Sequence, residues 1–151
     1  MGGVIPGVLG VAAFGALKFA GYSAAVWGLK KIEPSVTAGV AKIAAVRTGL
    51  GFLAGPPATF LGSYFVDHVF SPYDNLPYPA NSYVHNGFIY GVLFLVRILV
   101  WALTLLLFTK KAPLSRPRFW LYAFLGAVVS SLLDWPGYAL AIRAPGNIVI
   151  C

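Results

Sequence analysis

The sequence predicts an all-α polytopic integral membrane protein, built as a four-helix transmembrane bundle with a kinked second helix. Of its 151 residues, 59% are hydrophobic and only 10% are charged, whereas soluble domains average roughly 45–50% apolar and about 25% charged residues. The apolar residues form four long stretches, each able to supply the roughly 20 residues that cross a bilayer. Because these stretches fill the chain, residues 1–151 are expected to form a single transmembrane domain.

The first two spans are expected over residues 3–29 and 35–66. The first contains one charge, Lys18, and has no Lys or Arg before its apolar run, so we interpret it as a retained helix instead of a cleaved signal peptide. The second exceeds the length of a straight span and contains Pro56-Pro57. Two missing backbone donors predict a helix that is kinked, broken or re-entrant at its outer end.

The remaining spans are expected over residues 87–108 and 118–142. A segment rich in Pro, Tyr, Asn and Ser precedes them and predicts an outer surface loop over residues 70–86. Pro136 lies inside the fourth span and should bend it. The prediction therefore places the long polar connection between the second and third spans.

The charges of the connections predict the orientation. Lys30 and Lys31 follow the first span and Lys110 and Lys111 follow the third, whereas the connection after the second span has no Lys or Arg. The positive-inside rule then places the first and third connections in the cytoplasm and both termini on the non-cytoplasmic side. We expect a protein of the bacterial inner membrane.

Ionisable residues within the apolar stretches are the candidate functional residues, because an isolated charge in hydrocarbon costs a few kcal/mol and normally pairs or lines a polar cavity. A helical rise of about 1.5 Å per residue places Lys18, Arg47 and Arg97 near the membrane midplane and Asp134 above them. We expect Asp134 to pair with Arg97 or Lys18. The candidate ligand-binding residues are Arg47, Arg97, Lys18, Asp134, Asp67 and His68.

The charge imbalance of this set leads to the first functional hypothesis. Three cations face one or two acids, and the surplus positive charge needs compensation at low dielectric. The hypothesis is a non-enzymatic protein that binds or passes an anionic group, such as a lipid phosphate. Internal salt bridges alone, or Lys18 extending toward the cytoplasm, would remove the need for a ligand.

Two rival functions stay open. Small residues recur every four positions at Thr37, Ala41, Ala45 and Gly49, and such a face lets another helix approach. We expect mainly intrachain packing there, but a structural or assembly subunit of a larger membrane complex, or a homo-oligomer, would also use it. The other rival is an intramembrane hydrolase or transferase that uses Asp134 and His68. No nucleic-acid partner, cofactor or metal is expected.

Two short motifs resemble one another on helices of opposite direction. Lys18-x-x-Gly21-Tyr22 lies in the first span, and Asp134 with Gly137 and Tyr138 repeats this spacing in the fourth. Inverted repeats of this kind occur in many transporters. Five residues make this only a weak indication of an internal repeat.

Overall fold

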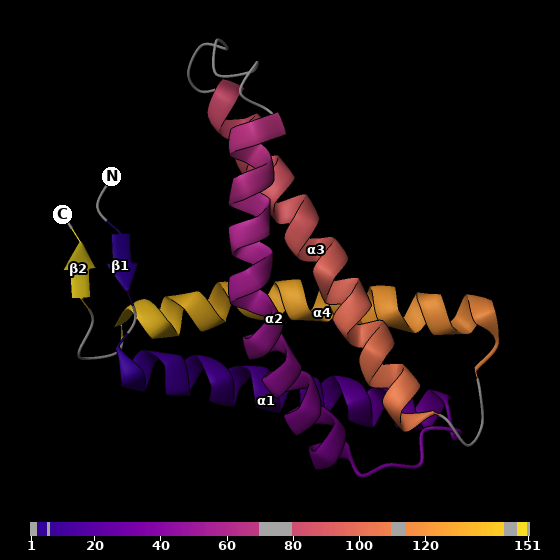
Figure 1. Ribbon diagram of the computed structural model, residues 1–151. Helices are drawn as coiled ribbons and strands as arrows, with labels where there is room; N and C mark the ends of the chain where they lie inside the picture. Colours follow the sequence, from indigo (N-terminus) through magenta and orange to yellow (C-terminus); the bar gives the residue numbers. More distant parts are fainter. Residues whose placement is uncertain (1–2, 6, 70–79, 110–113, 144–147, 151) are drawn as a thin grey trace.

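The computed structural model describes residues 3–5, 7–69, 80–109, 114–143 and 148–150. Four long helices dominate this part of the chain, and two short strands lie at its ends (Figure 1). In chain order the elements are β1 (Gly3–Ile5), α1 (Val8–Ile32), α2 (Val40–Val69), α3 (Ala80–Phe108), α4 (Arg116–Arg143) and β2 (Ile148–Ile150). The predicted all-helical character is confirmed.

The helices form two antiparallel pairs that cross each other. Helices α1 and α4 run side by side, and the α2–α3 pair crosses them steeply (Figure 1). The two pairs touch through contacts of α1 with α2 and of α3 with α4. The predicted four-helix transmembrane bundle is therefore not confirmed, because sequence periodicity does not determine the angle at which helices cross.

Three helical segments of the described residues are long and apolar enough to cross a membrane: Val8–Ile32, Gly87–Phe108 and Arg116–Ala141. Helix α2 has 30 residues, a sufficient length, but it is not among these three segments. It carries Lys42, Arg47 and the Pro56-Pro57 pair. Three of the four predicted spans therefore have the composition of a membrane helix, and a fourth span stays a prediction.

Helix α2 continues through its two prolines. Pro56 and Pro57 lie inside the helix, which has no break between Val40 and Val69. Figure 1 shows that its axis changes direction partway along. Proline is a recognised cause of such a bend because it removes a backbone hydrogen bond and crowds the preceding turn. The kink is present and the prediction of a broken helix is wrong, whereas a re-entrant outer end stays a prediction.

Two predicted boundaries need correction. Residues 3–5 pair antiparallel with residues 148–150, with Val4 opposite Val149, so the first helix begins at Val8 instead of residue 3. Helix α3 begins at Ala80, so residues 80–86, predicted as loop, are helical. A helix can continue beyond its apolar stretch because its backbone hydrogen bonds do not depend on side-chain polarity. Residues 70–79 of the predicted loop lie outside the described residues.

Small residues on α4 let the neighbouring helices approach closely. A Cβ atom at Gly126 would lie 2.4 Å from the Trp101 ring of α3, and one at Gly137 would lie 2.5 Å from Phe14 of α1. Trp101 is 3% exposed. Membrane helices pack through such small residues because the lipid offers no hydrophobic driving force between them. The position of α3 on α4 therefore depends on the missing side chain at Gly126.

Substitution of Gly126 by Ala should destabilise the protein by about 1–3 kcal/mol, the usual cost of overpacking a filled site, because the added methyl group must displace the Trp101 ring. Gly91→Ala is the matched control on α3, since nothing lies within 4 Å of a Cβ atom there. Thermal unfolding in detergent should show a lower midpoint for Gly126→Ala and no loss for Gly91→Ala. Equal midpoints would contradict this packing.

Candidate anion site at the helix crossing

The centre of the candidate site is the Asp134 carboxylate on α4. One oxygen forms an ion pair with Lys18 Nζ of α1, and the other forms an ion pair with Arg97 Nη2 of α3. The three side chains are 14%, 8% and 20% exposed, respectively. Both predicted partners of Asp134 are confirmed, and a single carboxylate connects three helices.

Two serines of α4 hold the same cations from a second direction. Lys18 Nζ donates a hydrogen bond to the Ser130 carbonyl oxygen at 2.9 Å, and Arg97 Nη1 donates one to Ser131 Oγ at 3.1 Å. Ser131 Oγ in turn donates to the Ala127 carbonyl at 3.0 Å. The positions of the two cations therefore do not depend on Asp134 alone.

Arg47 of α2 is the buried cation without a carboxylate partner in the described residues. It is 1% exposed, and its Nη2 donates to Ser130 Oγ at 3.3 Å. Its Nε and Nη1 atoms are buried and make no hydrogen bond. The guanidinium carbon lies 4.8 Å from the Tyr22 ring and 5.2 Å from the Trp101 ring, and such cation–π contacts offset only part of a buried charge.

A cavity of about 1010 Å³ lies at the crossing of the helix pairs and borders this cluster. This volume is at the upper end of the roughly 300–1,000 Å³ found for small-molecule sites. Its polar lining includes Lys18, Arg47, Thr48, Arg97, Ser130 and Asp134. Its apolar lining includes Phe14, Phe52, Phe60, Leu93, Val96 and Val100.

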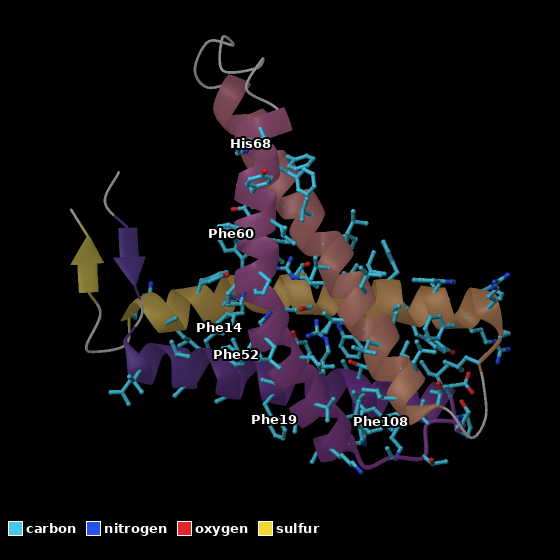
Figure 2. All side chains as sticks on the ribbon, in the orientation of Figure 1. Phe14, Phe19, Phe52, Phe60, His68 and Phe108 are labelled. Carbon is cyan, nitrogen blue, oxygen red and sulfur yellow. The ribbon has the colours of Figure 1, made fainter. Side chains whose placement is uncertain are left out.

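The apolar wall of the cavity reaches the molecular surface. Phe60 and Phe52 of α2 both line the cavity, and they are 72% and 43% exposed. Figure 2 shows both side chains beside α2, with Phe14 of α1 near Phe52. Phe14 and Phe52 are in edge-to-face contact, with 6.1 Å between ring centroids. The site therefore combines a cationic inner end with an aromatic and aliphatic side that extends outward.

The two similar motifs of α1 and α4 pack against each other. Lys18 pairs with Asp134, and the Tyr22 hydroxyl lies 2.8 Å from Ser130 Oγ. Tyr138, at the equivalent position on α4, packs on Phe14 with 5.3 Å between ring centroids. The shared spacing thus corresponds to matching contacts across an antiparallel helix pair, whether or not the chain contains a repeat.

The prediction that His68 belongs to the site is wrong. His68 lies at the far end of α2 (Figure 2), roughly 30 Å along the helix from Arg47 at about 1.5 Å per residue. It is exposed, its Nδ1 lies 2.9 Å from the Tyr64 carbonyl oxygen, and its ring stacks on Tyr64. The proposed acid–base pair of His68 and Asp134 therefore does not form. The Asp67 side chain lies outside the described residues.

Two aromatic residues of the site, Tyr22 and Trp101, are not among the residues predicted from the sequence to form it. Both rings lie next to the Arg47 guanidinium. Tyr22 follows Lys18 by four residues, and Trp101 follows Arg97 by four. Residues at this spacing share a helix face, so an aromatic residue one turn after Lys18 and after Arg97 was the available signal.

No protein-family description, curated protein or solved structure matches this chain. The candidate site is therefore defined by three features of the described residues. These are the bridging carboxylate of Asp134, the unpaired guanidinium atoms of Arg47, and the cavity beside them.

Replacing Asp134 by Ala should destabilise the protein by about 3–5 kcal/mol, because loss of one partner leaves buried charges uncompensated. The control is Leu132→Ala on the same helix, at a side chain that is 68% exposed. Thermal unfolding in detergent is the measurement. An Asp134→Ala protein as stable as the parent would contradict the bridging role of this carboxylate.

Proposed function

We propose that this chain is a small, non-enzymatic, multi-pass membrane protein that binds an anionic group, such as a lipid phosphate, in the cavity at the helix crossing. The observation that carries the proposal is Arg47. This guanidinium is buried, lines the cavity, and has two nitrogen atoms without a hydrogen-bond partner.

Charge balance supports an anionic ligand. Lys18 and Arg97 share the one carboxylate of Asp134, so the cluster with Arg47 contains three cations and one anion in its described residues. Arginine does not release its proton in proteins, and an uncompensated buried charge is strongly unfavourable. A bound phosphate or carboxylate would supply the missing negative charge.

The form of the cavity supports a lipid as the source of that anion. Its cationic residues lie at the inner end, whereas Phe52 and Phe60 belong to its exposed apolar side. In a bilayer, this apolar side would face acyl chains. A headgroup could then reach the cations while its hydrocarbon chain stays against Phe52 and Phe60.

The proposal includes four spans with both termini on the non-cytoplasmic side of a bacterial inner membrane. Glu33, in the connection between α1 and α2, lies 3.7 Å from Arg118 near the start of α4. This contact supports first and third connections on the same side, where the Lys and Arg residues of both favour the cytoplasm. Pairing of β1 with β2 likewise brings the two ends of the chain together.

One observation favours the second candidate, a subunit of a larger membrane assembly. Thr37, Ala41, Ala45 and Gly49 are all exposed, and nothing lies within 4 Å of a Cβ atom at Gly49. The expected intrachain packing of this small-residue face is therefore wrong. The face is free to contact another helix. Native mass spectrometry that retains partner subunits would support this function.

Arg47→Met tests the anion-binding function, because methionine keeps much of the side-chain volume and its aromatic contacts while removing the charge. We expect the variant to lose co-purified anionic lipid in native mass spectrometry. It should be at least as stable as the parent in lipid-free detergent, since replacing a buried charge by an apolar group is often neutral or stabilising. Lys42→Met, at an exposed lysine of the same helix, is the control that should keep the lipid.

An Arg47→Met protein that retains the same anionic lipid as the Lys42→Met control would contradict the function. The function would also be contradicted by a parent protein that carries no anionic lipid and binds no added alkyl phosphate. If Arg47 were purely structural, the Met variant would instead unfold at a markedly lower temperature.

Cys151 tests the orientation, since it is the only cysteine in the sequence. In intact cells or spheroplasts, a membrane-impermeant maleimide should label it without permeabilisation. A Cys151→Ser protein is the control for background labelling. Labelling that requires permeabilisation would place the C-terminus in the cytoplasm and contradict the proposed topology.

A further inference from the structure

We infer that Asp134 is an internal counter-ion that an incoming anion displaces from Lys18 and Arg97, so that this residue sets the affinity of the site. The inference rests on the proposed anion-binding function and deepens it. Its basis is that the Asp134 carboxylate occupies the position between two cavity-lining cations where an external anion would bind.

Accessibility supports displacement over simple addition. As whole residues, Lys18 is 6% exposed and Arg47 is 1% exposed, and the Arg97 side chain is 20% exposed. An anion that enters the cavity therefore meets Lys18 and Arg97 before Arg47. Both are already paired with Asp134, so the external anion and the carboxylate compete for the same donors.

The contacts of the two cations show why exchange is feasible. Lys18 also donates to the Ser130 carbonyl oxygen, and Arg97 also donates to Ser131 Oγ. These bonds would keep both cations directed at the cavity after the carboxylate moves away. Ligand donors that hold their positions without the ligand reduce the ordering cost of binding.

The charge of Arg47 favours the exchanged state. In the observed state, the three cations face one carboxylate. With an external anion bound to Lys18 and Arg97, the displaced Asp134 carboxylate would still belong to the cluster, so that three cations and two negative groups leave less uncompensated positive charge at low dielectric. Arg47 thus attracts the anion through its charge, and Asp134 limits how tightly the anion binds.

Asp134→Asn and Asp134→Glu form the matched test pair. Asparagine removes the competing charge at nearly constant size, whereas glutamate keeps it. The probe is decanesulfonate, which carries one negative charge and a hydrocarbon chain, and its Kd for purified protein in neutral detergent is measured by calorimetry. We expect Asp134→Asn to bind about tenfold tighter than the parent, equivalent to about 1.4 kcal/mol, and Asp134→Glu to bind within about threefold of the parent.

The outcomes separate this inference from the proposed function. If neither the parent nor any variant binds decanesulfonate, the anion-binding function fails and the inference fails with it. If the parent binds but Asp134→Asn binds equally or more weakly, the inference alone is overturned. A parallel titration with methanesulfonate distinguishes a free anion from the headgroup of an amphiphile as the source of the ligand. If the Asp134→Asn variant also binds methanesulfonate more tightly than the parent does, free anions displace Asp134 as well as amphiphiles.

A measurement on the parent chain covers the case in which Asp134→Asn does not fold. The protein is labelled with ¹³C-aspartate, and infrared difference spectra are recorded with and without decanesulfonate. Displacement from Lys18 and Arg97 should shift the carboxylate stretching band of one aspartate, and this shifted band should be missing in Asp134→Glu. An unchanged aspartate spectrum under saturating ligand would overturn the inference.

Discussion

The two ion pairs of Asp134 connect most of this structure. The carboxylate on α4 binds Lys18 of α1 and Arg97 of α3, and Ser130 one turn earlier accepts a hydrogen bond from Arg47 of α2. All four helices therefore contribute to one polar cluster. Where the surroundings are hydrocarbon, packing and polar contacts must hold helices together, and this cluster supplies most of the polar contacts at the crossing.

The same cluster is not balanced, and this imbalance is the reason that we propose a binding site instead of a purely structural network. A structural ion-pair network is most favourable when every donor has an acceptor. Here the guanidinium of Arg47 contacts the rings of Tyr22 and Trp101 but leaves two nitrogen atoms unpaired beside a cavity. Retaining such a residue costs folding stability, and binding an anion is the role that would recover it.

The sequence was sufficient to predict the helices and the ion pairs of Asp134, because both follow from strong local constraints. Long apolar stretches form helices, and a charge within them requires a partner. The crossing of the helix pairs was not predictable, since it depends on contacts between distant residues, such as Trp101 against Gly126. The assignment of His68 to the site fails for a related reason: the sequence does not show where along α2 the other helices cross, and His68 lies at the far end of α2.

The crossed arrangement also explains how one site can be cationic at one end and apolar at the other. Helices that cross steeply touch near the crossing and diverge beyond it, so the polar contacts concentrate where all four meet. Away from that point, the diverging helices present apolar side chains such as Phe52 and Phe60 to the cavity. At 25–30 residues, the helices are longer than the roughly 20 residues needed for a perpendicular span, so the four spans that we propose would have length to spare for tilting.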